Sequence, residues 1–307
     1  MSSLTDRYRK YVSFHNSLEP DIIPKQFYWT AIVTVFAVAN APVDRIYVLI
    51  FTFIQNLPIK GLDIYLTKYN NEVTKAQISS HFIVAIKGFL FFVALLAIAC
   101  PIFVSVRRSP SFWKQLGIKR IAVVSLYFFV ILSLLAFPYS YPYGLLSHPS
   151  GLASLGVSYG KMSLSPFAES YDIVARRLLK PAIAYFIQMQ GYILYYIFSL
   201  VCIYILIFMT VVFLESKIVS THRLGETTPA IYTRKFWVYL SAMTSSYMMV
   251  CFQWPGYPEN IFFILILLTA CLPMSRQARL GTVALCIVTH DGSAFALIPI
   301  ILFCFPK

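Results

Sequence analysis

Seven apolar stretches separated by polar segments constrain the fold of this chain more than any other feature. A membrane-spanning helix needs about 20 apolar residues, with roughly 17 to 25 tolerated. The sixth stretch approaches that length only if its helix begins at Pro258 and Glu259, where proline is tolerated in the first turn. The sequence therefore predicts one all-α membrane domain over residues 1–307, a polytopic helical bundle of about seven spans at approximately 27–43, 82–105, 121–137, 191–214, 236–252, 260–273 and 279–303.

The composition agrees with a membrane protein and excludes several other classes. Hydrophobic residues make up 59% of the chain and charged residues 12%, and the mean hydropathy is +0.72. Soluble domains have about 45–50% and 25% instead. These values exclude a disordered chain, a nucleic-acid-binding module and a small disulfide scaffold. The six cysteines lie in or beside apolar stretches without metal-ligand spacing, so we expect no disulfide and no zinc site.

The distribution of Lys and Arg predicts the orientation. With residues 1–26 placed in the cytoplasm, the inside segments contain 15 basic residues and the outside segments contain 8. Positive charge is normally concentrated on the cytoplasmic side and contacts anionic headgroups there, so the net charge of +13 predicts lipid contact and no nucleic-acid partner. Ala39-Asn40-Ala41 resembles a signal-peptidase site, but Pro42 disfavours cleavage and we interpret the first stretch as a retained span.

Two external loops follow from this order of spans. The first, residues 44–80, contains the short apolar segment 46–58 and is predicted to lie on the membrane surface as interfacial helices. The second, residues 139–180, is rich in Gly, Ser, Pro and Tyr and is predicted to form an ordered lid. The chain has no convincing internal repeat, which weighs against an inverted-repeat transporter.

Three carboxylates on the predicted outer side are candidate catalytic groups. Asp44 lies where the first span ends; it either stops the helix at the interface or acts as a general base or electrostatic stabiliser at a lipid-linked substrate. Glu169 and Asp172 are spaced to share one face of a helix. Asp172 also has the spacing to pair with Arg176 within that helix, which is the purely structural alternative.

A basic cluster follows these carboxylates. Arg176, Arg177 and Lys180 lie on the outer side, where topology does not require positive charge. Guanidinium groups bind phosphate oxygens bidentately and Lys adds a point charge, so the cluster predicts a lipid phosphate or pyrophosphate site.

The segment 253–260 predicts a tight external turn between the fifth and sixth spans. Trp254 and Tyr257 are typical of the aromatic belt at a membrane interface, with Pro and Gly forming the turn. The alternative is a carbohydrate subsite in which Trp254, Tyr257 and Glu259 contact a sugar.

Ionisable residues within apolar stretches predict a second, buried polar site. His290 and Asp291 interrupt the last stretch, and a helix counted from Gly281 places Asp291 about 15 Å along, near mid-bilayer. Being adjacent, the two side chains need separate partners. Lys87 in the second stretch either snorkels outward, pairs with Asp291 or binds a headgroup.

Taken together, the arrangement resembles the GT-C superfamily of integral-membrane glycosyltransferases. The resemblance rests on seven spans, an acidic residue opening a membrane-lying first loop, and acidic residues in the second loop. The segments 165–181, which ends in an Arg-x-Leu-x-Pro element, and 256–259, Gly-Tyr-Pro-Glu, resemble elements of uncharacterised bacterial multi-pass members. The resemblance implies that Asp44 falls at the family's catalytic acidic position, that Glu169 or Asp172 falls at its second acidic position, and that Arg176 and Arg177 hold the carrier phosphate.

The function predicted from this resemblance is transfer of a sugar from a polyprenyl-phosphate carrier in cell-surface glycan assembly at the bacterial inner (plasma) membrane. The sequence does not indicate a cofactor, and a divalent metal is left open. Two alternatives are kept: a transporter or flippase using Lys87, His290 and Asp291, and a non-catalytic subunit whose buried charges pair with another membrane protein. No large external domain follows the seventh stretch, so acceptor recognition would come from the lid or from a partner subunit.

Overall fold

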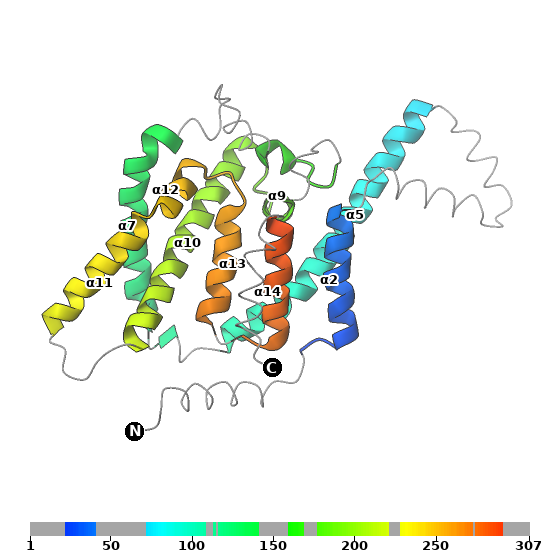
Figure 1. The fold of residues 1–307 in the computed structure, drawn as a ribbon. Coiled ribbons are helices and arrows are strands. Elements are labelled where there is room, and N and C mark those ends of the chain that lie inside the picture. Colours follow the sequence, from blue (N-terminus) through cyan, green and yellow to red (C-terminus); the bar gives the residue numbers. More distant parts are fainter. Residues whose placement is uncertain are drawn as a thin grey trace.

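The fold is known from a computed structural model that describes residues 22–40, 72–108, 113–114, 116–140, 159–168, 177–220, 228–272 and 274–290. Within these ranges every regular element is helical, as the sequence predicts. Figure 1 shows the elements: α2 (Lys25–Asn40), α5 (Glu72–Arg107), α7 (Ile118–Ser140), α9 (Leu179–Phe186), α10 (Tyr192–Ser220), α11 (Thr228–Met243), α12 (Ser246–Gln253), α13 (Glu259–Cys271) and α14 (Arg276–Thr289).

Three of these helices contain segments that are long and apolar enough to cross a membrane. They are His81–Arg107 in α5, Ile118–Leu135 in α7 and Ile193–Ser216 in α10, with mean hydropathies of 2.8, 2.1 and 2.9. Only 28% of the α5 window and 17% of the α7 window is buried in the protein, so most of their apolar side chains face outward. Such surfaces are stable in lipid and costly in water. The chain is therefore a helical membrane protein.

The remaining predicted spans are shorter or broken within the described residues. The fifth predicted span is not one helix, because α11 ends at Met243 and α12 begins at Ser246. The Ser245 hydroxyl accepts a hydrogen bond from the Met248 amide and caps α12, an alternative to helical pairing that serine offers readily. The prediction of a continuous helix over 236–252 was wrong for this reason.

The boundaries of three other elements differ in detail from the prediction. α13 begins at Glu259 directly after Pro258, the start that the sixth stretch needs to approach spanning length, but it ends at Cys271, before the predicted 273, and has 13 residues. α14 begins at Arg276, earlier than the predicted 279, and ends at Thr289. α5 begins at Glu72, so the last residues of the predicted first external loop belong to the same helix as the second span.

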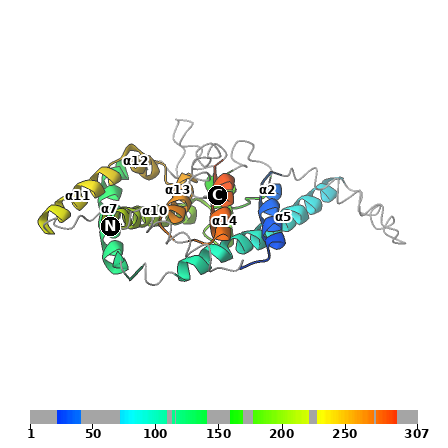
Figure 2. The same ribbon diagram turned by 60° about the horizontal axis from the view of Figure 1, so that its bottom comes forward.

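Within the described residues the helices form two main packed cores that share α13, beside a small third cluster around Leu272, Met274 and Ala278. One core gathers side chains of α2, α5, α9, α14 and the start of α10, and the other gathers side chains of α7, α11, α12 and the rest of α10. Phe263, Ile264 and Leu268 of α13 pack against both cores. Figure 2 shows α13 between the α7–α12 group and the α2–α5 pair. Because α13 is common to both cores, its first residues have a fixed position relative to α9, α10 and α14.

Gly281 of α14 lies where three helices approach closely. A Cβ atom there would overlap the Tyr28 hydroxyl of α2 and come within 2.8 Å of Ile98 Cγ2 of α5. The same hydroxyl donates a 2.6 Å hydrogen bond to the Gln277 carbonyl. Glycine is therefore required for α14 to pack against α2 and α5 at this distance.

The longer helices of the described chain alternate in direction, so this part of the chain has two well-defined ends (Figure 1). α2, α7 and α14 begin at the same end at which α5 and α10 finish. This end carries the basic residues of the predicted inside segments that the structure describes, among them Arg107, Lys119, Arg120 and Arg276. The arrangement agrees with the alternation used in the topology prediction; the N-in orientation itself and the seven-span count remain predictions.

Candidate functional site

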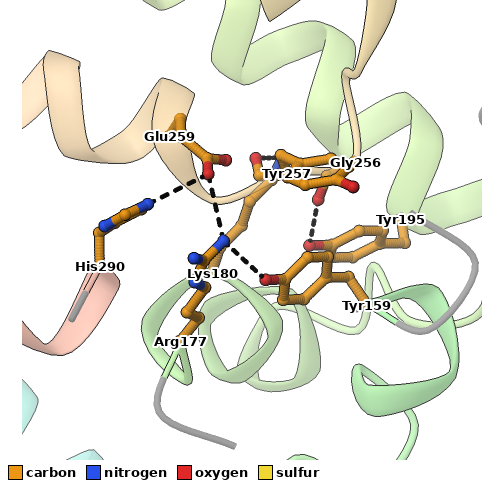
Figure 3. A network of polar contacts seen from close by, with 8 residues as sticks. All are labelled: Tyr159, Arg177, Lys180, Tyr195, Gly256, Tyr257, Glu259 and His290. Atoms are coloured by element: carbon orange, nitrogen blue, oxygen red, sulfur yellow. Dashed lines mark hydrogen bonds and ion pairs between the residues drawn. The ribbon is translucent and has the colours of Figure 1, made fainter. Parts of the chain in front are cut away.

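Three side chains from distant parts of the sequence meet at the end of the bundle where α13 begins and α14 ends (Figure 3). Glu259 Oε1 lies 3.3 Å from Arg177 Nη1 and 3.4 Å from His290 Nε2. The side chains of Arg177, Glu259 and His290 are 24%, 28% and 25% exposed. A carboxylate in this position can orient the imidazole. The group combines a fixed cation, a carboxylate and a titratable base that a ligand can reach.

Helix geometry explains why Glu259 and His290 are neighbours. α13 and α14 are consecutive, pack against each other and have 13 and 14 residues, so the first residue of one lies beside the last of the other. Glu259 lies in the first turn of α13, where a carboxylate offsets the partial positive charge of the helix start. His290 follows the last turn of α14 in extended backbone, and its amide donates to the Cys286 carbonyl.

One oxygen of Glu259 is available for further hydrogen bonding within the described structure. Oε1 receives both contacts, whereas Oε2 is buried and has no hydrogen-bond partner among the described residues. A buried acceptor without a partner costs roughly 1–3 kcal/mol. A ligand hydroxyl that donated to Oε2 would remove this cost.

Tyr159 extends the group toward the interior. Its hydroxyl lies 3.5 Å from Arg177 Nη1, which can donate to it, and its ring packs edge-on against Tyr257 at 5.6 Å between centroids. Burial raises the pKa of Tyr159 well above its usual value, although the Arg177 charge acts in the opposite direction. Burial, together with the Glu259 carboxylate, raises the pKa of Tyr257 to about 12. Both phenols are therefore neutral hydrogen-bonding groups at physiological pH.

The turn at Pro255–Tyr257, which leads into α13, rests on a fully buried ammonium group. Lys180 Nζ donates to the carbonyls of Pro255 and Tyr257 at 2.7 and 2.8 Å, and it lies 5.4 Å from the centre of the Tyr195 ring. The Lys180 side chain has no exposed surface. Burial lowers the pKa of Lys180 from 10.5 to about 8.

The remaining carbonyl of this turn is also paired. The Tyr195 hydroxyl donates to the Gly256 carbonyl at 2.9 Å, and Asn260 Nδ2 donates to the Pro255 carbonyl at 3.1 Å. Tyr195 and Asn260 are each 2% exposed. Three consecutive carbonyls of the 255–257 turn therefore point to buried donors, as Figure 3 shows for Lys180 and Tyr195.

These contacts do not fit the phosphate-binding role predicted for Lys180. Its ammonium faces carbonyl oxygens in the protein interior and has no surface to offer a ligand. Arg177, by contrast, is partly exposed and remains suited to a phosphate. In the basic cluster, Lys180 is therefore buried and Arg177 is within reach of a ligand. Arg176 lies outside the described residues.

The structure joins groups that the sequence suggested separately. Arg177 was predicted as a phosphate ligand, Glu259 as a sugar contact and His290 as a buried polar group, and all three are in contact. Tyr257 adjoins them through Tyr159, and the Trp254 ring packs against Tyr257 at 5.9 Å. One feature of the sequence could have predicted the contact of Glu259 with His290. The two helices joined by the connection after Cys271 have nearly equal lengths, which brings the start of the first beside the end of the second.

The helix that leads to His290 begins earlier than predicted. The prediction counted from Gly281, but α14 begins at Arg276, so His290 lies 14 residues along, about 21 Å at 1.5 Å per residue. Lys87 is buried on α5, with 7% exposure. Asp44, Glu169, Asp172 and Asp291 lie outside the described residues, and their predicted roles stay predictions.

A groove of about 570 Å³ lies between α5, the 159–168 segment and α9. Its walls are mainly apolar, and close approach of the 159–168 segment depends on Gly88, whose Cβ would stand 3.3 Å from the Phe167 ring. His81, Ser165 and Tyr185 are the polar groups at its surface. The groove shares α9 with Lys180 and is large enough for part of a hydrocarbon chain.

Comparison with known proteins gave no relative. No protein-family model matches the chain, and no curated protein or solved structure is similar to it at a significant level. In the parts of the chain that the structure describes, no three His, Cys, Asp or Glu side chains gather to hold a metal ion.

A second polar cluster lies near the opposite end of α10. Glu215 is 2.7 Å from Lys235 Nζ and 3.5 Å from Arg120 Nη2, and it accepts a short hydrogen bond from the Tyr239 hydroxyl. Tyr195 and Glu215 are 20 residues apart on α10, about 30 Å. The two polar clusters are therefore separated by about the thickness of a bilayer's hydrocarbon core. The Glu215 cluster joins α7, α10 and α11 and has the character of a structural tie.

Proposed function

We propose that the chain is an integral-membrane glycosyltransferase, or polymerase, that takes a sugar from a polyprenyl-phosphate carrier in cell-surface glycan assembly. The observation that carries the proposal is the contact of Arg177, Glu259 and His290 at one end of the bundle. A lipid-linked phosphate is held near the end of a membrane helix bundle, where its chain lies in lipid and its charge at the interface. An anion-binding side chain beside a carboxylate–imidazole pair suits that substrate.

The proposed reaction needs a base for the acceptor hydroxyl and a cation for the carrier phosphate. The acceptor hydroxyl attacks the anomeric carbon, a new C–O bond forms, and the bond from that carbon to the carrier phosphate oxygen breaks with its electron pair. His290, oriented by Glu259, takes the hydroxyl proton. Arg177 stabilises the negative charge on the departing phosphate, a role suited to a fixed cation in a partly dry site. Asp44, Glu169 and Asp172 remain candidates for the base, and Arg176 for a second phosphate ligand.

The groove beside α9 supports a carrier with a long hydrocarbon chain. Its apolar walls belong to α5, a helix that can span a membrane, and to α9, which is next to Arg177 in the sequence. A chain in this groove would be continuous with the lipid around α5. We further propose seven spans with the N-terminus inside, which places the site on the outer face of a bacterial inner membrane, where surface glycans are assembled.

The test is binding of undecaprenyl phosphate and its sugar adducts to the purified protein, measured by native mass spectrometry. We expect Arg177→Ala to weaken carrier binding at least tenfold, because a charge-assisted guanidinium–phosphate interaction contributes about 1.5–3 kcal/mol. The matched control is Arg276→Ala, an exposed arginine at the start of α14. Glu259→Gln and Asp44→Asn are expected to keep the carrier bound. Absence of selective carrier binding by the wild type would refute the proposal.

A transporter remains the second candidate because of one observation. α14 stops at Thr289 and His290 continues in extended backbone, and helix breaks of this kind line substrate sites in transporters. This candidate predicts pH-dependent flux into proteoliposomes that His290→Ala and Asp291→Asn abolish. A lipid-phosphate transferase predicts no such flux.

A further inference from the structure

The 255–257 turn has an unusual set of partners for a segment at the end of a membrane bundle. Its three consecutive carbonyl oxygens all point inward, and each accepts a hydrogen bond from a buried side chain. Backbone carbonyl oxygens are among the groups that coordinate bound cations. Here the position of such a cation is filled by the ammonium of Lys180, which contacts two of the three oxygens.

The surroundings favour a positive charge at this point. The Tyr195 ring presents a π face to the ammonium at 5.4 Å, and the negative charge of Glu259 acts on it from the start of α13. Among the described residues, the thiols of Cys202 of α10 and Cys251 of α12 also act on this charge. Four elements, α9, α10, α12 and α13, therefore meet around this single group.

Glu259 follows the turn after one residue. Its carboxylate reaches Arg177 and His290 only if α13 begins where it does, and the turn that sets this start is tied to α9 through Lys180. Tyr195 and Asn260 hold the same turn from α10 and α13. Arg177 lies just ahead of α9, so the same tie sets the spacing between Arg177 and Glu259.

We infer that Lys180 is a positioning residue, a built-in cation that holds the 255–257 turn and thereby places Glu259 beside Arg177 and His290. Methionine at this position would fill similar space without the cost of burying a charge. The ammonium places the turn by donating hydrogen bonds to its carbonyls, and methionine has no hydrogen-bond donor in its side chain. The consequence for carrier turnover rests on the proposed function, but the positioning of the turn does not.

The experiment is hydrogen–deuterium exchange of the full-length protein in detergent at pH 7, followed in peptides that cover residues 253–261. We expect Lys180→Met and Lys180→Ala to speed exchange of the turn amides at least tenfold. Exposed Lys161, changed to Met, is the matched control and is expected to leave exchange unchanged. Peptides around Glu215 report on global folding and should exchange as in the wild type.

Chemical rescue distinguishes the effect of the ammonium charge from the effect of the side-chain volume. Propylammonium supplies the atoms that Lys180→Ala removes, and we expect it to restore slow exchange in that variant but not in Lys180→Met, where the space is filled. 1-Propanol has similar size and no charge and is expected to restore little. Equal rescue by propanol, or wild-type exchange in both Lys180 variants, would overturn the inference.

Carrier binding distinguishes this inference from the proposed function. If the wild type binds no carrier lipid, the proposed function fails while the exchange measurement still decides the role of Lys180. If the carrier binds, Lys180→Ala is expected to lose transfer, with propylammonium restoring it.

Discussion

The buried Lys180 ammonium predicts a pH dependence of stability that its replacement removes. The pKa of this group is about 8 in the folded protein, against 10.5 for a lysine in the unfolded chain. Between these two values the unfolded state carries a proton that the folded state has released. The unfolding free energy therefore rises with pH across this window, and the gain is lost as pH falls through 8. The difference between the two values corresponds to about 3 kcal/mol, at 1.36 kcal/mol per pH unit.

The assay compares the unfolding free energy of the wild type with that of Lys180→Met from pH 7 to pH 10. We expect the wild-type value to rise relative to the variant by about 3 kcal/mol, mostly above pH 8, because groups common to both proteins cancel in the difference. Lys161→Met, which changes an exposed lysine of the neighbouring segment, should follow the wild type. A pH-independent difference between wild type and Lys180→Met would show that the ammonium does not titrate as its burial requires.

Two further predictions concern helix packing away from the site. Glu215→Gln should lower the unfolding free energy by about 3 kcal/mol because Lys235, whose side chain is 12% exposed, would keep a charge without its carboxylate. Adding Lys235→Met should recover much of that loss, and simple additivity of the two changes would contradict the coupling. Gly281→Ala should cost about 2 kcal/mol by overpacking against Tyr28 and Ile98. Tyr28→Phe in the same chain should reduce this cost in thermal unfolding, and an unchanged melting temperature in Gly281→Ala would count against the close packing.

The apolar stretches were enough to predict the helical class and most helix positions. The length of an apolar stretch can be read from one segment without its neighbours. Proline is tolerated in the first turn of a helix, so Pro258 by itself indicates a helix start near Glu259. The break before Ser246 was missed because a serine cap competes with helix continuation only weakly, and neighbouring helices decide the outcome.

The candidate site was predicted as isolated residues and not as a group. Arg177 and Glu259 are separated by 82 positions, and no local pattern reports a contact over that distance. The role of Lys180 was predicted incorrectly because the sequence shows its charge but not its burial. The pairing of Glu259 with His290 could have been predicted by counting the same number of residues backward and forward from the connection between α13 and α14.

The order of synthesis gives the Lys180 contacts a consequence for biogenesis. The carbonyls that Lys180 binds lie 75 and 77 residues later in the chain. At 5–20 residues per second, the ribosome needs about 4 to 15 seconds to make them after Lys180. During that interval the ammonium has no carbonyl partners from this turn and is more stable near water than inside the bundle. We therefore expect α9 to remain at the membrane surface until the segment leading into α13 has been synthesised, and to dock against the bundle only then. This docking is therefore expected to be a late step in assembly of the bundle.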